Sequence, residues 1–314
     1  MRYLQNRLVA VFLNMKIAFA CCMRREAFND QPIWKDVAGA APDCLLLLGD
    51  QIYMDFGYLP PEPMGAPRYY DDDKFREYME RKYRAQWNEP NFRALFQDMQ
   101  EKRAVFGIWD DHDFAWNNAK GLEVSASKKR ISREAFNFWM YGKRADQDIY
   151  RIADFHPDVR IVLLDTRYYA DKNAQLLGAA QWNFLEGALV HDKRYTILCS
   201  GITLDRGSEN WRGYAAEYAR LAALLAGRKS LLLLSGDIHE NAFNPPGGGR
   251  PCYEIISSGA AINRFGLPFA FDERHNWGLL ELGAGGIAAT LHDKKGVAMK
   301  YWIDAGSWTH RRDA

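Results

Sequence analysis

Short, densely apolar segments that end in a carboxylate constrain the fold of this 314-residue chain more than any other feature. Four consecutive leucines, Leu45 to Leu48, run directly into Gly49 and Asp50, and the pattern returns in SLLLLSGD at 230–237. A segment this short and this apolar is typical of a strand buried on both faces, as in a parallel sheet covered by helices. Either the chain merely turns after each strand, or the strand ends carry a site.

Strand-like and helix-like patterns alternate as far as residue 250, and after that point only short strand-like segments follow. This order is typical of an α/β fold in which two sheets pack together with helices on the outside. The chain has no internal repeat, low-complexity segment or linker, so we predict a single domain over residues 1–314. The predicted strands are 16–22, 43–50, 104–111, 159–166, 195–202, 230–237, 252–258, 277–283, 287–293 and 298–304, and the predicted helices are 71–86, 91–101, 128–140, 181–190 and 213–227.

The amino-acid composition argues against several classes of protein. With 41 basic and 40 acidic residues, the net charge of +1 gives no general attraction to nucleic acid or to a membrane. Five cysteines, an odd number without a Cys-x-x-Cys pair, argue against a disulfide framework and predict a reducing, cytoplasmic location. The apolar stretch Leu8 to Leu13 is shorter than a secretory signal, and no run approaches the ~20 apolar residues of a membrane span. Because Met15 could also start translation, residues 1–14 are a candidate N-terminal extension.

The predicted strands repeatedly end in side chains that bind metals. In an open α/β sheet the carboxyl ends of parallel strands meet at one crevice, where ligands bind. Carboxylate, imidazole, phenol and thiol groups gathered there form a donor set for metal ions. The residues concerned are Cys21, Cys22, Asp50, Tyr53, Asp110, Asp111, His112, Asp113, Asp165, Asp237 and His239.

Each of these residues also has a simpler interpretation. Gly-Asp after a strand is a common turn, and a cysteine such as Cys22 more often packs in a core than binds a metal. Asp237 and His239, however, are two positions apart and can face the same side. The four polar residues of DDHD, beside Trp109, would be costly to bury without partners. The joint occurrence of these features favours a metal site.

In these motifs the chain resembles the PhoD-like (alkaline phosphatase D) family of the calcineurin-like metallophosphoesterases. The resemblance implies a two-sheet αββα sandwich, which agrees with the order of the predicted elements. It also implies a metal-dependent phosphoester hydrolase, a phosphodiesterase or phosphomonoesterase, that uses water activated by two metal ions. The matching segments, in family order over residues 16–260, are IAFACC, PDCLLLLGDQIYMD, IWDDHDFAWNN, RIVLLDTRYY, LLGAAQWNFLE, LLLLSGDIHENAF and YEIISSG.

The resemblance assigns ligands to a first metal by position. Asp50 corresponds to the carboxylate that bridges the two metals, and Tyr53 corresponds to a phenolate ligand. Cys22, not Cys21, occupies the position of the family's cysteine. Since neighbouring side chains on a strand point to opposite faces, we expect Cys21 to face away from Cys22. A thiolate combined with a phenolate suits Fe(III).

The other implied ligands complete a second metal site. Asp111 takes the place of the superfamily's asparagine ligand. Asp237 and His239 stand where the superfamily has His-x-His, so that each metal receives one ligand from this pair. Asn118 lies where an additional ligand could come from. An all-oxygen second site suits Ca(II), Mn(II) or Mg(II), and Zn(II) is an alternative.

The resemblance also implies catalytic residues for a small phosphoester substrate. His112 corresponds to the imidazole near the phosphate, and Asp113 to its orienting partner. Arg167 would either hold the phosphate or pair with a carboxylate. Substrate preference is expected to depend on the loops 56–70, 114–127, 205–212 and 244–250.

Two other functions share these motifs. One is a metal-containing scaffold that binds a phosphorylated ligand without turnover, and the intact His112 argues against it. The other is a phospholipase-like hydrolase of lipid head groups. We identify no basic amphipathic helix that would dock on a bilayer, which makes this second function less favoured. No feature of the sequence indicates an oligomeric state.

Overall fold

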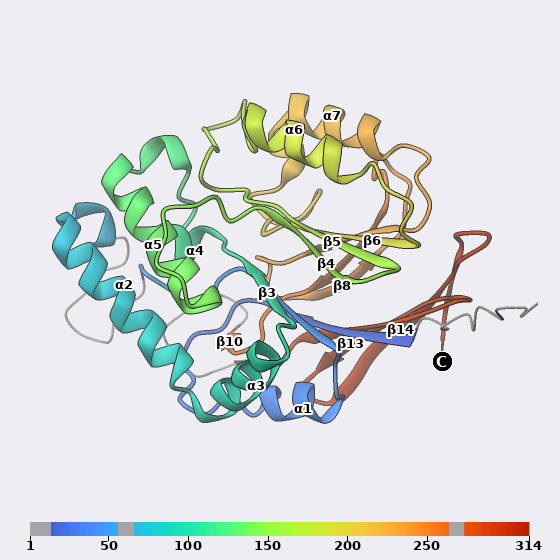
Figure 1. Ribbon diagram of the computed structural model, residues 1–314, viewed down its shortest axis with the longest axis horizontal. Coiled ribbons are helices and arrows are strands. Elements are labelled where there is room, and N and C mark those ends of the chain that lie inside the picture. The colour runs from blue at the N-terminus through green and yellow to red at the C-terminus, as the bar shows by residue number, and fades with distance from the viewer. Residues whose placement is uncertain (1–13, 56–65, 264–272, 314) are drawn as a thin grey trace, which may run out of the picture.

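Two β-sheets packed face to face form the centre of the molecule, and helices cover their outer faces (Figure 1). The computed structural model describes residues 14–55, 66–263 and 273–313. This architecture confirms the two-sheet α/β sandwich predicted from the sequence. The candidate N-terminal extension lies outside the described residues except for Asn14, which is the first residue of the first strand.

The first sheet has seven strands in the order β15-β14-β13-β12-β1-β2-β3. Its first three strands in chain order are parallel to one another, and the C-terminal hairpins extend the sheet in antiparallel fashion beside β1. The strands are β1 (Asn14–Ala20), β2 (Cys44–Leu48), β3 (Val105–Ile108), β12 (Trp277–Gly283), β13 (Gly286–Asp293), β14 (Gly296–Asp304) and β15 (His310–Arg312).

The second sheet has six strands in the order β4-β5-β6-β7-β9-β8. Its four central strands are parallel, and β4 and β8 form antiparallel edges. The strands are β4 (Arg151–His156), β5 (Val159–Leu163), β6 (Tyr195–Cys199), β7 (Leu231–Ser235), β8 (Asn241–Asn244) and β9 (Tyr253–Ser257), and a separate short pair is formed by β10 (Ile262–Asn263) and β11 (Glu273–Arg274).

Local sequence signals explain where the longer helices begin and end. Asp71 and Ser125 cap their helices by accepting hydrogen bonds from backbone N–H groups three residues later. Gly142, with a φ of 70°, ends the second of these helices in the left-handed conformation that glycine favours. The helices are α1 (Ile33–Gly39), α2 (Asp72–Trp87), α3 (Pro90–Glu101), α4 (Asp111–Phe114), α5 (Ala126–Tyr141), α6 (Ala179–Ala188) and α7 (Ala215–Leu225), with 3₁₀ turns η1 (Ala66–Tyr69), η2 (Gly121–Glu123) and η3 (Trp211–Gly213).

The leucine runs are buried on both faces, as their composition predicts. In β7, Leu232 and Leu234 belong to the core that joins the two sheets. Leu231 and Leu233 point the other way and pack with Leu185 under α6 and α7 (Figure 1). Each leucine buried in this way stabilises the fold by roughly 1.5–3 kcal/mol relative to an exposed one. The sandwich therefore depends on strands that are apolar at every position.

All strands and helices predicted from the sequence are present, with ends shifted by a few residues. The structure adds α1, α4, β4, β8, β10, β11 and β15, which are short or carry polar side chains and so give weak periodic signals. Within the described ranges, no helix combines the length and the apolarity needed to cross a membrane.

Glycines allow the strand ends to approach one another closely. Gly49 has a φ of +104°, and a Cβ at this position would lie 2.6 Å from Cβ of Asp110. A Cβ on Gly236 would lie 2.6 Å from Sγ of Cys21. The glycine of each Gly-Asp motif is therefore required for steric reasons, independently of the carboxylate that follows it.

We predict that Gly49→Ala destabilises the protein by about 2 kcal/mol or more, because it combines an unfavourable φ with overlap against Asp110. Gly39→Ala is the matched control, since a Cβ there meets nothing within 4 Å and alanine favours the helix. Urea unfolding of both variants measures the difference. Equal stability of the two variants would contradict the steric role of Gly49.

Candidate metal centre

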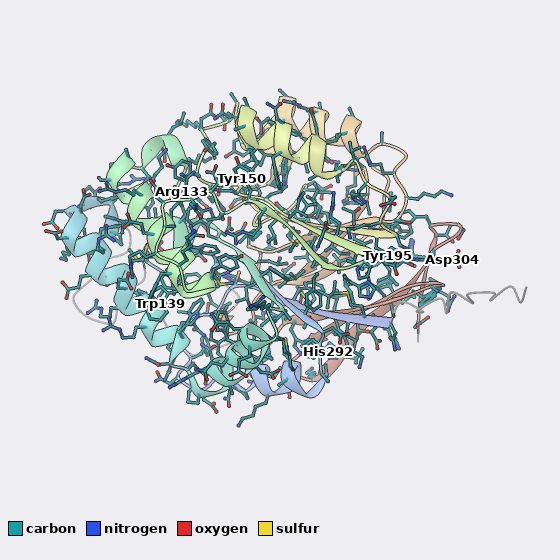
Figure 2. All side chains as sticks on the ribbon, viewed as in Figure 1. Arg133, Trp139, Tyr150, Tyr195, His292 and Asp304 are labelled. Atoms are coloured by element: carbon teal, nitrogen blue, oxygen red, sulfur yellow. The ribbon has the colours of Figure 1, made fainter. Side chains whose placement is uncertain are left out.

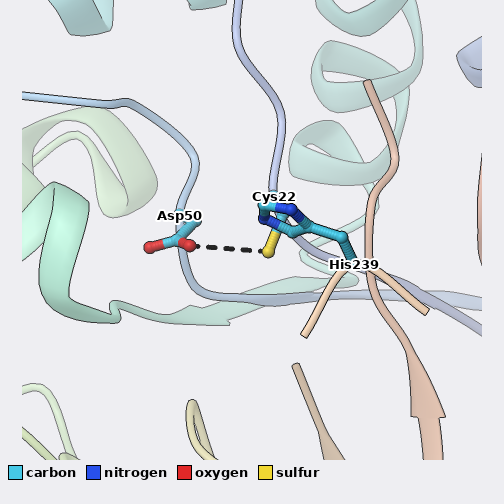
Figure 3. Close-up of side chains that lie close together, drawn as sticks. All are labelled: Cys22, Asp50 and His239. Atoms are coloured by element: carbon cyan, nitrogen blue, oxygen red, sulfur yellow. Dashed lines mark hydrogen bonds between the residues drawn. The ribbon is translucent and has the colours of Figure 1, made fainter. Parts of the chain in front are cut away.

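The predicted ligands meet where parallel strands of both sheets end. Cys22 follows β1, Asp50 follows β2 and Asp111 follows β3, whereas Asp237 and His239 follow β7 of the other sheet. Figure 3 shows the side chains of Cys22, Asp50 and His239 converging on one point. The crevice at the carboxyl ends of the strands therefore receives ligands from both sheets.

An uncommon backbone conformation marks four of these residues and also Asn118. Within the described part of the chain, nine non-glycine residues have a positive φ, and five of them are Cys22, Asp50, Asn118, Asp237 and His239. Such conformations cost on the order of 1–3 kcal/mol each and cluster at functional sites. Hydrogen bonds between the strand ends help to hold them, because the N–H of Cys22 donates to the carbonyl oxygen of residue 49 at 3.2 Å.

A first cluster contains sulfur, oxygen and nitrogen donors. Oδ2 of Asp50 lies 3.4 Å from Sγ of Cys22 and 3.2 Å from Oη of Tyr53. Oη of Tyr53 lies 3.3 Å from Nε2 of His239. Ligand atoms of Cys22, Asp50 and His239 all lie within 4.8 Å of one another, which is a separation that one metal ion can span.

A second cluster contains only carboxylates. Asp50, Asp110, Asp111 and Asp237 each place an oxygen within 4.8 Å of the others. Asp50 is common to both clusters, which is the position that a bridging carboxylate requires. The clusters therefore correspond to one site with mixed donors and one site with oxygen donors.

The electrostatics of these clusters fit cations. Within the described residues, Asp50 Oδ1, Asp110 Oδ2 and Asp111 Oδ1 are buried without a hydrogen-bond partner. Burial, and then the neighbouring Cys22, raises the pKa of Asp50 well above its ordinary value, and burial raises the pKa values of Cys22 and Tyr53 as well. Unpaired buried anions are costly, and bound metal ions would remove that cost.

Arg167 is buried among these carboxylates. Its Nε donates to Asp110 Oδ1 at 2.5 Å, its Nη1 donates to Glu209, and its Nη2 lies 3.7 Å from Asp111 Oδ1. Burial acts to lower the pKa of Arg167, but the carboxylates outweigh it and raise that pKa, so the guanidinium stays charged. Of the two roles considered for Arg167, the structure shows the pairing with carboxylates.

His112, on the short helix α4, places a ring nitrogen within 4.8 Å of ligand atoms of Asp50 and Asp111, at the boundary of the two clusters. Its Nδ1 lies 2.5 Å from Asp55 Oδ1, and its ring packs against that of Tyr53 with 4.2 Å between centroids. Burial acts to lower the pKa of His112, but the charges of Asp55, Asp111 and Asp50 outweigh it and raise that pKa well above its ordinary value. The surrounding carboxylates therefore favour the protonated imidazolium.

Asp113 does not take the orienting role expected from the sequence. Its Oδ1 accepts a hydrogen bond from the N–H of Asp110 at 2.6 Å, and its Oδ2 accepts one from the N–H of Gln51 at 3.1 Å. As the third residue of α4, Asp113 folds back onto the residue that caps the helix. The carboxylate that binds Nδ1 of His112 is Asp55.

Cys21 also differs from expectation, and Asn118 does so in part. Because β1 ends at Ala20 and Cys22 adopts a φ of 62°, the alternation of a strand is lost. The two thiols then lie 3.4 Å apart instead of on opposite faces. Asn118 reaches Asp111 through its backbone N–H, at 2.5 Å from Oδ2, while its side chain is exposed. A metal-binding role for the Asn118 side chain stays a prediction.

Two residues of the site, Asp55 and Glu209, were not candidates from the sequence, and Asp110 was a candidate donor without an assigned ligand role. Asp55 ends the segment GDQIYMD, and Asp110 opens DDHD, so both lay within motifs that had been recognised. Glu209 lies 42 positions from its partner Arg167 and carries no local signal. Only the packing of distant segments identifies it.

The fold and the two donor clusters agree with the metal-dependent phosphoesterase expected from the sequence. A family model described as PhoD-like phosphatase matches residues 17–246. The chain therefore belongs to the PhoD-like phosphatase family, and it is a metal-dependent phosphoesterase. No curated protein sequence matches the chain.

One solved structure shares the fold over most of this chain. A structure of PhoD superposes with a TM-score of 0.70 at 16% identity, over 96% of this chain and 72% of that one. TT1561 of Thermus thermophilus gives a TM-score of 0.42 at 7% identity, over 96% and 98% of the two chains. YfcE, a phosphoesterase from E. coli, gives 0.30 at 11% identity, over 96% and 99%. The likeness to PhoD supports the fold, and the other two are too distant to add to it.

We predict that Cys22→Ser weakens metal binding at the first cluster by at least about tenfold, because a thiolate ligand is lost. Cys21→Ser is the matched control, since its thiol is equally buried but lies outside the group formed with Asp50 and His239. Metal content after dialysis, measured by mass spectrometry, distinguishes the two variants. Equal metal loss in both would show that Cys22 is not the ligand.

We predict that metal removal destabilises the protein more at pH 8 than at pH 5. Burial raises the pKa of Asp110 to about 6, and raises the pKa values of Asp50 and Asp237 well above the ordinary range. In the metal-free protein, the protonated forms of these carboxyl groups stabilise the native state. This stabilisation is complete below the ordinary carboxylate pKa of about 4 and is lost as the pH rises through the raised pKa values. Bound metal ions would compensate the anions at either pH.

Urea unfolding with and without chelator, at pH 5 and pH 8, tests this dependence. Asp237→Asn provides the comparison, because it removes one of the groups whose pKa is raised and should flatten the pH dependence of the metal-free protein. A chelator effect of equal size at both pH values would show that these anions are not compensated by metal.

Proposed function

We propose that the chain hydrolyses small phosphoesters at a dinuclear metal centre. The observation that carries this proposal is that Asp50 belongs to both donor clusters. His112 lies next to these clusters, and its Nδ1 is hydrogen-bonded to Asp55. A shared carboxylate places two metals close together, and an adjacent imidazole provides a proton donor near them.

Cys22, Asp50, Tyr53 and His239 would hold the first metal, for which their donor atoms favour Fe(III). Asp50, with carboxylates including Asp111 and Asp237, would hold the second, for which Ca(II), Mn(II) or Mg(II) is the expected ion and Zn(II) the alternative. When bound, the metal pair supplies Lewis acidity to phosphoryl oxygens and lowers the pKa of water.

The protein's own residues position the substrate and move the proton. With Nδ1 engaged by Asp55, Nε2 of His112 is the nitrogen that would donate to the leaving oxygen. Burial acts to lower the pKa of His112, but the charge of Asp55, which lies outside the metal clusters, raises it and so favours the protonated imidazole that a general acid requires. Arg167 acts indirectly: by pairing with Asp110 and Glu209 it fixes the carboxylate wall of the second cluster.

Membership in a phosphatase family favours turnover over a binding-only scaffold. The five cysteines, all buried and unpaired, support the cytoplasmic location expected from the sequence.

A panel containing a phosphomonoester, a phosphodiester and a glycerophospholipid tests the substrate class. Hydrolysis of the lipid alone would favour the phospholipase-like alternative, and no hydrolysis of any member by metal-loaded protein would contradict the proposal.

We predict that His112→Ala lowers kcat by ~10²–10⁴ toward an alkyl phosphoester, because general acid catalysis contributes on this scale. The loss should be much smaller for a nitrophenyl ester, whose leaving group needs little protonation. Steady-state kinetics with both esters, at equal metal content, measures the difference. An equal loss with both esters would show that His112 does not protonate the leaving group.

Asp55→Asn is the companion variant for this experiment. Asparagine retains the size of Asp55 but removes the charge that raises the pKa of His112. The alkaline limb of the pH–rate profile, where His112 loses its proton, should therefore shift to lower pH in Asp55→Asn. An unchanged profile would contradict the pairing of Asp55 with the catalytic imidazole.

A further inference from the structure

A second group of ionisable side chains lies at the other end of the parallel strands, where β6 and β7 begin. A cleft of about 140 Å³ opens there. Tyr195, at the start of β6, and Asp304, at the end of β14, mark this end of the molecule (Figure 2). No acidic residue lines the cleft in the described part of the chain, and its basic lining residues are His191, Lys193, Arg194, Arg228 and Lys229.

Three of these cations are anchored on backbone carbonyl oxygens. Arg228 donates from Nε and Nη1 to two carbonyls, at 2.8 and 3.1 Å. Arg194 donates from Nη1 at 3.2 Å, and Lys229 from Nζ at 3.4 Å. Among the described residues, none of the three has an ion-pair contact with a carboxylate. A carbonyl dipole orients a cation without neutralising it, so the cleft keeps a positive potential.

Two acidic residues outside the lining, Asp154 and Asp192, act on the imidazole of His191, and Asp154 is paired with Arg160. Asp154 lies 2.7 Å from Arg160 and 3.9 Å from Lys193. Burial, and then the charge of Arg160, lowers the pKa of His191. Its Nδ1 accepts a hydrogen bond from the N–H of Lys193 at 3.1 Å, which is the arrangement of a neutral ring.

Hydroxyl donors complete the lining. Since Nδ1 of His191 accepts, its Nε2 carries the hydrogen and donates to Thr196 Oγ1 at 3.1 Å. The hydroxyl hydrogen of Thr196 is then left to donate elsewhere. Ser230 also lines the cleft and adopts a φ of 62°, a conformation that is uncommon outside glycine and that recurs at ligand sites.

We propose that this cleft binds a phosphate-type oxyanion, either inorganic phosphate or the phosphoryl group of a small molecule. Guanidinium, ammonium and hydroxyl donors suit an anion with several acceptor oxygens, and the absence of lining carboxylates disfavours a cation. At ~30 Å³ per water molecule, the volume admits such an ion with part of its hydration shell. The site is separate from the metal centre, and it does not depend on the reaction proposed there.

Binding would also connect the two sheets. Arg194 donates to the carbonyl oxygen of Ala284, in the turn between β12 and β13. Lys229 donates to the carbonyl oxygen of Gly306, in the turn between β14 and β15. Both turns belong to the first sheet, whereas the cations flank strands of the second. An anion held by these cations would therefore stabilise the contact between the sheets.

Titration of the metal-loaded protein with inorganic phosphate, followed by thermal unfolding, tests the proposal. Lys229→Gln should weaken the phosphate-dependent stabilisation by about tenfold in apparent affinity, the scale of one lost charged hydrogen bond. Lys295→Gln is the matched control, because this exposed lysine lies in the turn between β13 and β14. Phosphate bound at the metal centre contributes equally to all variants, so the difference between the two variants isolates the cleft.

Three further measurements decide the outcome. Both variants should unfold like the native chain in phosphate-free buffer and should keep its kcat. Glycerol phosphate in place of inorganic phosphate distinguishes the sources: stabilisation by the ester alone assigns the cleft to a phosphoryl group, and stabilisation by both assigns it to the free ion as well. Equal phosphate responses of Lys229→Gln and Lys295→Gln would mean an adventitious ion only and would overturn the proposal.

Discussion

The burial of several acidic ligands around Asp50 is the constraint on which the rest of this structure depends. Asp50, Asp110, Asp111 and Asp237 come within 4.8 Å of one another in a place where water does not screen their repulsion. A chain would not bring these groups together for stability alone. Among the described residues, the buried guanidinium of Arg167 contacts two of the carboxylates, Asp110 and Asp111. The arrangement is therefore best understood as a preformed cage for cations, whose binding free energy contributes to the stability of the native state.

This constraint also explains the unusual backbone at the strand ends. Four of the converging residues and the neighbouring Asn118 adopt a positive φ, and Gly49 and Gly236 permit contacts that a side chain would prevent. The surrounding sheets are rigid because their leucines are buried on both faces. Strain at the site is thus maintained by packing elsewhere, which is how a fold can hold reactive groups in a fixed geometry.

The helix α4 shows how one short segment serves several purposes. Asp111 contributes to the oxygen cluster, His112 binds Asp55, and Asp113 caps the helix by accepting from the N–H of Asp110. Four consecutive polar residues can be buried because all have partners: Asp110 and Asp111 face Arg167 and the oxygen cluster, His112 faces Asp55, and Asp113 faces backbone N–H groups. Sequence reasoning recognised the tetrad as a site but gave Asp113 the partner that belongs to Asp55, since the direction of each side chain depends on where the helix begins.

The sequence by itself determined the sandwich, the strands that compose it and the residues at their ends, because burial on both faces and strand–helix alternation are local properties of the chain. It also determined family membership, through motifs that are short and contiguous. Only the tertiary structure decided which atoms meet. The contact of His112 with Asp55 spans 57 positions and that of Arg167 with Glu209 spans 42, and the approach of Cys21 to Cys22 arises from a backbone turn at the end of β1. Such contacts are fixed by how the two sheets pack against each other, and a pattern read along the chain does not contain that information.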